Sequence, residues 1–189
     1  MDGIVRARVG YAGGTAPDPT YRTIGDHTET LQVDFDPSRL AYADLLDVFW
    51  TSHRPTSPAP SRQYASIIFA HDDEQRIAAE ESRRTAEERF GRVFTDIVPL
   101  ERFYLAEAYH QKYRLRNTGP LYREFRSFYR DEADFRESTA AARVNGYIDG
   151  WGTREELEAE IASFGLSPEG QALLRQMVPE RTRFWQKVR

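Results

Sequence analysis

Three residues placed for chemistry, Tyr21, His27 and Glu29, fall close together in the stretch from residue 8 to residue 29. Glu29 opens an alternating run in which its side chain shares one strand face with three apolar residues, Leu31, Val33 and Phe35. A carboxyl group at the end of a buried strand face loses hydration, which favours its neutral form. We therefore expect Glu29 to be able to donate a proton.

Each of these residues also has an ordinary structural interpretation. Glu29 could be an exposed acid at a strand end where the pleat has already met water, which is the usual place for Glu. Tyr21 could be a half-buried ring with its hydroxyl in water. His27 could serve turn packing, and the sequence pattern by itself leaves these alternatives open.

The elements that must position these residues are two strands and a loop. Residues 4–10 predict a strand, Gly13 and Gly14 a tight turn, and residues 28–35 a second strand. Pro17 and Pro19 fix φ and hold Tyr21 in a defined loop. A phosphate cradle is the alternative for the glycines, but neither a dinucleotide fingerprint nor a Gly-Lys-Ser/Thr ending is present.

An ordered series of motifs resembles the A-type peptide methionine sulfoxide reductases. The motifs are R-V-G-Y-A-G-G, P-D-P-T-Y-R, G-D-H-T-E, V-D-F-D-P, L-L-D-V-F-W, R-Q-Y-A-S-I-I-F with H-D-D-E-Q, and F-Y-L-A-E-A-Y-H-Q-K-Y. They run from about Gly3 to Tyr113. One motif would be weak, but the same order over more than half the chain is specific.

The resemblance implies a fold and a reaction. The fold is an α/β sandwich of the ferredoxin-like, split βαβ type with a mixed sheet. The reaction is reduction of methionine-S-sulfoxide, free or in proteins, to methionine. The resemblance gives Glu29 the role of general acid on the departing oxygen, and Tyr21 and Tyr64 the role of hydrogen-bonding that oxygen. His27, two residues before Glu29, is expected to have a supporting role in substrate binding.

The chain lacks the nucleophile that the resemblance implies. Family members attack the sulfoxide sulfur with the Cys of a Gly-Cys-Phe-Trp motif, whereas this chain has no cysteine. Only a thiolate supplies the soft nucleophile that this chemistry uses. We expect no reduction by the printed chain, no cofactor, and dependence of any active form on an external thiol reductant such as a thioredoxin-like protein. The four histidines have no metal-site spacing.

The chain also departs from the family pattern beside Tyr64. Arg54 stands where Asp is usual, and the loop of residues 53–61 is shorter than in many family members and lacks their Asp before the tyrosine. These changes alter the surroundings of the oxygen site, so substrate preference is expected to differ.

Composition excludes several classes of protein. The net charge of -4, with acids and bases interspersed, argues against a nucleic-acid binder. No apolar run approaches the roughly 20 residues of a membrane span, and no signal layout opens the chain. We expect a cytoplasmic monomer, unless exposed sheet edges pair.

The remaining sequence predicts further elements. A helix follows Ala41, which stands where a capping Ser is frequent, and residues 64–70 predict a buried strand. A helix starts at Asp72 or Asp73 and ends before Gly91, and a strand covers residues 94–98.

Residues 1–116 are expected to form the reductase-like domain, and 117–189 a helical extension packed on it. In the extension Asn145-Gly146 predicts a helix break, Thr153 with Glu156 a capping box, and Ser167-Pro168 a helix start. The basic residues at the end, Arg181, Arg183, Lys187 and Arg189, predict a solvated tail.

In the family fold a strand before the present start lies inside the sheet. Burying about five of its apolar residues contributes on the order of 1.5 to 3 kcal/mol each, comparable to the roughly 5 to 15 kcal/mol of a whole domain. We expect in-frame coding sequence for Gly-Cys-Phe-Trp upstream. Two functions follow: a reductase whose nucleophile lies outside the printed chain, or a non-catalytic relative that keeps a sulfoxide-binding or protein-interaction surface.

Overall fold

The computed structural model describes residues 2–178 and shows an α/β protein with two small sheets. Strands β1 (Ile4–Ala12), β2 (Thr28–Phe35) and β5 (Phe103–Leu105) form an antiparallel sheet in the order β2-β1-β5. Strands β3 (Ser66–Ala70) and β4 (Thr95–Pro99) form a parallel pair. The expected α/β class is confirmed, but the strands make two sheets rather than one mixed sheet, because no ladder joins β2 to β3 within residues 2–178.

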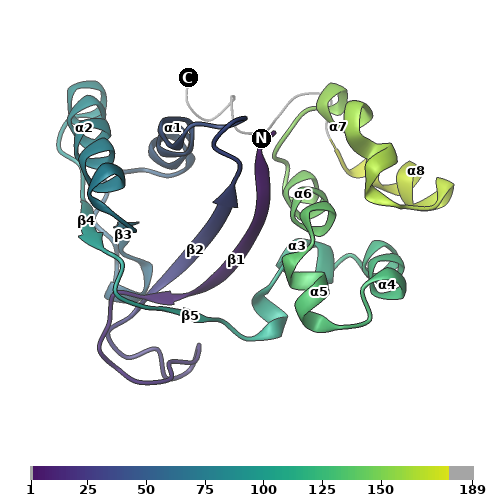
Figure 1. Cartoon of the computed structure of the whole chain (residues 1–189), viewed down its shortest axis with the longest axis horizontal. Coiled ribbons are helices and arrows are strands. Elements are labelled where there is room, and N and C mark those ends of the chain that lie inside the picture. The colour runs from purple at the N-terminus through teal and green to yellow at the C-terminus, as the bar shows by residue number, and fades with distance from the viewer. Residues whose placement is uncertain (1, 179–189) are drawn as a thin grey trace.

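Two helices pack with the parallel pair. Helix α1 (Tyr42–Ser52) follows β2, and helix α2 (Asp73–Phe90) connects β3 to β4. Their shared core contains Leu46, Trp50, Ile68, Ala79, Ala86 and Val93. The Trp50 indole Nε1 also donates to Ser82 Oγ at 2.9 Å, which ties α1 to α2. Figure 1 shows this group on the left and the long β1 and β2 strands crossing the middle.

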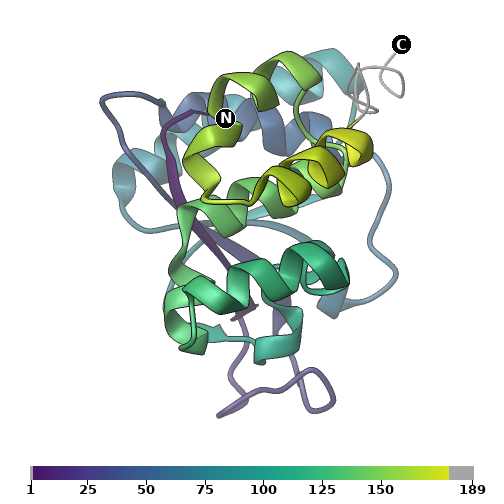
Figure 2. The ribbon, with the colours of Figure 1, turned by 90° about the vertical axis from the view of Figure 1, so that its right-hand side faces the viewer.

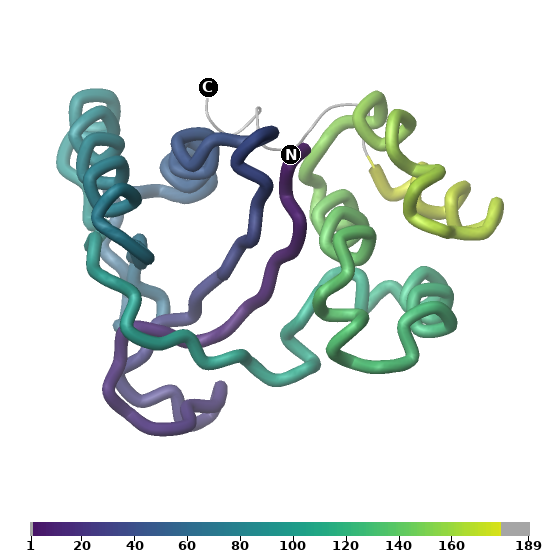
Figure 3. The backbone as a smooth tube through the Cα atoms, in the orientation of Figure 1, coloured from purple at the N-terminus to yellow at the C-terminus, as the bar shows by residue number. Residues whose placement is uncertain are grey.

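The second half of the chain is helical, as expected. It contains α3 (Tyr113–Arg116), α4 (Gly119–Phe128), α5 (Glu132–Glu137), α6 (Thr139–Ile148), α7 (Arg154–Glu160) and α8 (Pro168–Met177), with short 3-10 turns η2 (Ala108–His110) and η3 (Ile161–Phe164). These helices bury their own apolar cluster, which includes Phe125, Phe135, Val144 and Leu174. Figure 2 faces this layer, and the tube in Figure 3 shows β1 between it and the α1–α2 group.

Polar side chains attach the helical layer to β1. The Arg8 guanidinium Nε lies 2.8 Å from a carboxylate oxygen of Glu137 in α5, and Thr139 Oγ1 at the start of α6 donates to the carbonyl of Val5 at 2.5 Å. The ammonium group of Lys112, which is 6% exposed, donates to the carbonyl of Ala7. The layer therefore covers one face of β1 through charged and backbone contacts.

Local signals placed several helix ends correctly. Asp72 caps α2 by accepting from the Gln75 amide, and Gly91 ends that helix with φ of 85°. Thr153 and Glu156 form the predicted capping box, and Ser167 caps α8. The predicted break at Asn145-Gly146 is wrong, because α6 continues through both residues.

Two further observations concern the chain as a whole. Within residues 2–178, none of the helices combines the length and apolar character that crossing a membrane requires. The basic end from Arg181 to Arg189, predicted to be a solvated tail, lies outside the described residues.

Candidate functional site

Tyr21, Tyr64 and Glu29 come together from three separate segments. Tyr21 lies in the loop between β1 and β2, Glu29 on β2, and Tyr64 in the 3-10 turn η1 (Arg62–Tyr64) before β3. Interaction with the Tyr21 hydroxyl is the main cause of a raised pKa of Tyr64, and the negative charge of Glu29 is a smaller cause. The two phenols and one carboxyl group therefore share one small region.

The side chain next to Tyr64 fixes the Glu29 carboxylate. Gln63 Nε2 donates to Glu29 Oε1 at 2.7 Å. This bond orients one carboxylate oxygen toward η1 and leaves the other oxygen without a protein donor among the described residues. The amide thus holds Glu29 beside the pair of phenols, a role that the sequence pattern did not indicate.

Glu29 is exposed, so the prediction of a desolvated carboxyl on a buried strand face is wrong. The reason is that no layer covers this end of β2 within residues 2–178: Leu31, two residues further along the same face, is 62% exposed. Any proton that Glu29 gives has to come from a carboxyl group in contact with water. Glu29 remains a candidate proton donor because it lies close to the two phenols, not because it is buried.

His27 holds the loop rather than facing a ligand. Its ring is 1% exposed, Nδ1 accepts from the Gly14 amide at 3.1 Å, and Nε2 therefore carries the proton and donates to the Ala16 carbonyl at 2.8 Å. Both ring nitrogens are used. The expected substrate-binding contact is corrected to a positioning role, because no ring atom is left to offer.

Asp26 holds the same loop from the other side. Its carboxylate accepts from the amides of Thr15 at 2.9 Å and Ala16 at 3.1 Å, and these bonds lower the pKa of Asp26 to about 2. Gly14 permits the close approach, since a Cβ there would lie 2.6 Å from both Asp26 Oδ1 and the His27 ring. The turn predicted at Gly13-Gly14 is thus fastened to the start of β2.

Arg62 joins this loop to η1. Its Nη2 donates to the Gly13 carbonyl at 3.0 Å, and its own carbonyl accepts from Thr28 Oγ1 at 2.8 Å. Because Arg62 is two residues from Tyr64, these bonds set the distance between Tyr64 and the β1–β2 loop. They bridge the antiparallel sheet and the β3–β4 pair, which no strand ladder joins within the described part of the chain.

Glu107, which the sequence reasoning did not single out, fixes Tyr21. Its carboxylate accepts from the Tyr11 hydroxyl at 2.7 Å and from the Tyr21 amide at 3.1 Å. Burial alone would raise the pKa of Glu107, but these hydrogen bonds and nearby His110 hold it below its ordinary value. The only signal was its place in F-Y-L-A-E-A-Y-H, directly after the strand that pairs with Tyr11.

The arrangement can bind a strong hydrogen-bond acceptor. Two exposed phenols, 41% and 52% exposed at Tyr21 and Tyr64, can donate to one oxygen with a carboxyl group beside it. No cysteine occurs in the 189 residues, so the chain has no thiol to offer. Among residues 2–178, no group of three His, Asp or Glu side chains is placed to hold a metal ion.

Comparison with known proteins gives one consistent family. The sequence model of the family named Peptide methionine sulfoxide reductase matches residues 1–143. The peptide methionine sulfoxide reductase of Drosophila melanogaster is 43% identical over 169 residues, which are 88% of this chain and 68% of the relative. The MsrA protein of Methanothermobacter thermautotrophicus is 49% identical over 129 residues, covering 62% of this chain and 76% of the relative.

A solved structure agrees with the sequence relatives. The crystal structure of Mxr1 from Saccharomyces cerevisiae in reduced form superposes with a TM-score of 0.58 at 30% sequence identity. The superposition covers 63% of this chain and 74% of that protein. The likeness in sequence spans the part of the chain that carries Tyr21, Glu29 and Tyr64.

Proposed function

The chain belongs to the peptide methionine sulfoxide reductase family, and from this premise we propose that Tyr21, Tyr64 and Glu29 bind the oxygen of methionine-S-sulfoxide. The observation that carries the proposal is that the three side chains come together: the Tyr21 hydroxyl raises the pKa of Tyr64, and Gln63, the residue before Tyr64, donates to Glu29 Oε1 at 2.7 Å. A sulfoxide oxygen carries a large partial negative charge, and two phenolic donors suit it better than they suit the thioether of methionine.

In the proposed reaction this chain binds and protonates the oxygen, and a thiol supplies the nucleophile. A thiolate attacks the sulfoxide sulfur, the sulfur–oxygen bond breaks, and the oxygen leaves as it gains protons; overall two thiols become one disulfide, and methionine and water are formed. Glu29 supplies a proton to the oxygen while Tyr21 and Tyr64 stabilise the charge on it. The printed residues contain no cysteine, so the thiolate has to come from elsewhere.

The partners follow from this division. We propose a thioredoxin-like protein or a small thiol as reductant, no cofactor, and methionine sulfoxide, free or in proteins, as ligand. We also retain the division into a reductase-like domain at residues 1–116 and a helical extension at 117–189. It is supported by an apolar cluster whose described members, apart from Leu115, all lie within residues 117–189.

Binding tests the proposal directly. Methionine-S-sulfoxide titrated into the protein should shift the NMR signals of Tyr21 and Tyr64, while methionine should not. Tyr64→Phe should weaken binding about tenfold, the size of one lost hydrogen bond of ~1.4 kcal/mol. Tyr113→Phe is the matched control, because Tyr113 is 55% exposed and was not assigned to the site. Equal shifts with methionine and with its sulfoxide would contradict the proposal.

Binding without reduction is the second candidate, and the absence of cysteine favours it. Incubation with methionine-S-sulfoxide and excess dithiothreitol separates the two. Methionine formed faster than with dithiothreitol alone, and lost in Glu29→Gln, supports assisted reduction. The same methionine yield with and without protein, together with the NMR shifts above, supports a binding module.

A further inference from the structure

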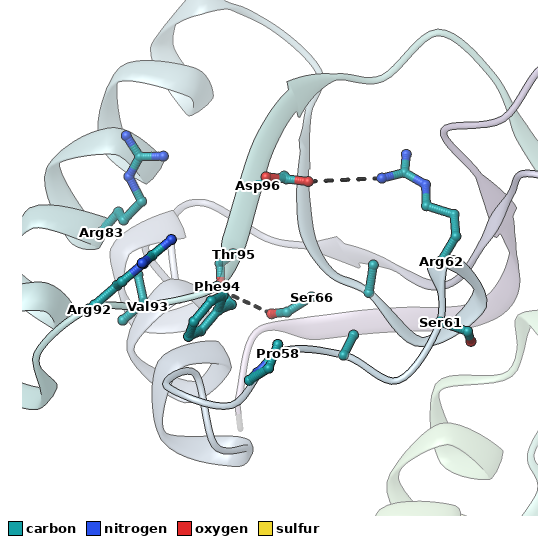
Figure 4. Close-up of a pocket in the computed structure, with 12 residues that line it drawn as sticks. Pro58, Ser61, Arg62, Ser66, Arg83, Arg92, Val93, Phe94, Thr95 and Asp96 are labelled. Atoms are coloured by element: carbon teal, nitrogen blue, oxygen red, sulfur yellow. Dashed lines mark hydrogen bonds and ion pairs between the residues drawn. The ribbon is translucent and has the colours of Figure 1, made fainter.

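A basic cleft opens directly beside the segment that carries Tyr64. It has a volume of about 460 Å³ and lies between the N-terminal ends of β3 and β4, the second half of α2 and the loop of residues 58–62. Ser61, Arg62, Ala65 and Ser66 form part of its wall, so the wall begins within two residues of Tyr64. Figure 4 shows the side chains that line it.

The lining carries three arginines and one acid. Arg62, Arg83 and Arg92 contribute positive charge from η1, α2 and the segment before β4 respectively. The acid is Asp96, which lies 3.9 Å from Arg62 with both side chains well exposed to water. Such an exposed pair is weak, so it neutralises little of the positive charge.

Two of the arginines lack an acidic partner in the part of the chain that the structure describes. Arg83 Nε is buried without a hydrogen-bond partner there. The Arg92 guanidinium lies 5.0 Å from the Phe94 ring and is otherwise directed to the cleft that it lines. No acid among the described residues neutralises either guanidinium, and an anionic oxygen is the acceptor that suits such a group.

The hydroxyl groups at the strand ends are already hydrogen-bonded within the chain. Ser66 Oγ lies 3.0 Å from Thr95 Oγ1 and 2.9 Å from His53 Nε2. Because His53 Nδ1 donates to the Phe49 carbonyl, His53 Nε2 accepts the Ser66 proton, so the donors left for a ligand are the guanidinium groups, which match the two oxygens of a carboxylate. The cleft thus offers guanidinium donors to a carboxylate, and Asp96 is the one acidic residue in its lining that would repel that carboxylate.

We propose that this cleft binds an acidic side chain of the sulfoxide substrate, so that peptides with Asp or Glu near methionine sulfoxide are the preferred ligands. This inference rests on the proposed function, because the sulfoxide has to occupy the site at Tyr21 and Tyr64. The wall of the cleft begins within two residues of Tyr64, and an extended peptide advances about 3.3 Å per residue, so the acid is expected a few positions from the sulfoxide. Arg62, as one of the arginines that line the cleft, would then help to select the substrate.

The test compares binding of three ligands by calorimetry. They are a neutral capped peptide containing methionine-S-sulfoxide, the same peptide with Glu placed two, three or four residues away on either side, and free methionine-S-sulfoxide, whose own carboxylate is the other possible source of negative charge. We expect the best acidic peptide to bind about fivefold tighter than the neutral one, with the advantage shrinking as salt rises. Free methionine-S-sulfoxide should show no such advantage over its neutral N-acetyl amide.

Variants assign the preference to the cleft. Arg83→Gln with Arg92→Gln should bring the acidic-to-neutral ratio close to one, and Asp96→Asn should increase it. Arg84→Gln is the matched control, because Arg84 is on the same helix, is 69% exposed and pairs with Glu81 at 3.8 Å. Thermal unfolding of each variant confirms that it is folded before its ratio is used.

The failures of the two proposals are distinct. If the neutral peptide causes no shift at Tyr21 and Tyr64, the proposed function fails. If it binds there but the acidic peptides bind no tighter, or if Arg84→Gln lowers the ratio as much as the cleft variants do, the cleft proposal alone is overturned. A preference shown only by free methionine-S-sulfoxide also overturns it, because the backbone carboxylate would then be the group recognised.

Discussion

At the scale of single residues, the site depends on groups that hold others in place. Glu107 accepts a hydrogen bond from the Tyr21 amide, and Gln63 orients Glu29. Asp26 and His27 hold the β1–β2 loop in place. Each of these residues acts through a hydrogen bond whose partner could not be predicted from the sequence. The residues predicted to act on a ligand are therefore held near one another by a second set of residues.

Asp26 should make stability depend on pH at the acid end. The pKa of Asp26 falls from 3.8 to about 2 on folding, chiefly because it accepts hydrogen bonds from the Thr15 and Ala16 amides. The unfolded chain therefore binds the proton more readily, so the contribution is complete above pH 3.8 and is lost as pH falls toward 2. Urea unfolding from pH 6 to 2 should show Asp26→Asn less stable at pH 6 and equal to wild type near pH 2. A constant difference across this range would contradict the assignment.

Lys112 should act at the alkaline end. Burial lowers the pKa of Lys112 from 10.5 to about 8. Between these values the unfolded chain holds a proton that the folded chain has released, so stability should rise with pH, by on the order of 1 kcal/mol per unit. The difference in unfolding free energy between wild type and Lys112→Met isolates this effect from other titrating groups. A difference that stays flat from pH 8 to 10 would show that Lys112 keeps its proton.

At the scale of elements, the start of α1 lacks a cap. Ala41 has extended backbone, with φ of -80° and ψ of 151°, and its side chain offers no acceptor to the first turn. Asp44 already accepts from the Ala41 amide at 3.0 Å, which is half of a capping box. The helix thus has the reciprocal partner in place but not the hydroxyl that would complete the pair.

Ala41→Ser should stabilise the protein by about 1 kcal/mol, because Ser Oγ can accept from the amide of Asp44. Chemical unfolding would show a higher midpoint with an unchanged slope. Ala41→Val is the control of similar size without a hydroxyl, and it should not stabilise. Equal effects of Ser and Val would attribute any gain to packing rather than to capping.

Helix ends could be predicted where the signal was local, whereas the burial of individual side chains could not be predicted. Asp72 and Gly91 bound α2, and Thr153 caps α7, through contacts with residues a few positions away. The break expected at Asn145-Gly146 failed because Asn145 Oδ1 accepts from the Leu115 amide at 3.1 Å, a bond across 30 residues that local reading cannot foresee. The predicted burial of Glu29 failed for the same reason, since it depends on which layer covers β2.

The same contrast holds for the candidate site. Tyr21, Glu29 and Tyr64 were placed by motif order, and the structure brings them together. Glu107 and Gln63 were missed because their partners lie 86 and 34 residues away in sequence. The alternation and spacing of residues in the sequence predict one helix or strand at a time. The hydrogen bonds of Glu107 and Gln63 depend instead on how loops from different parts of the fold meet.

At the scale of the molecule, two apolar cores lie on either side of the long β1–β2 strands (Figure 1). One contains α1, α2 and β3, and the other the C-terminal helices. The contacts that attach the second core to β1 include the Arg8–Glu137 ion pair and the Lys112 and Thr139 bonds to backbone carbonyls. From this polar attachment we predict that one core can lose its packing without directly opening the other.

Phe125→Ala should test this separation. Phe125 is fully buried in the C-terminal core, and its truncation should cost about 3 to 5 kcal/mol of packing. If the cores are separate units, hydrogen exchange should quicken across α4, α6 and α8 while β3 amides stay protected. Phe128→Ala, on the same helix but at a side chain that is 52% exposed, should change little. Equal loss of protection in β3 and in α6 would instead mean that the two cores unfold as one cooperative unit, and that the division at residue 116 has no thermodynamic basis.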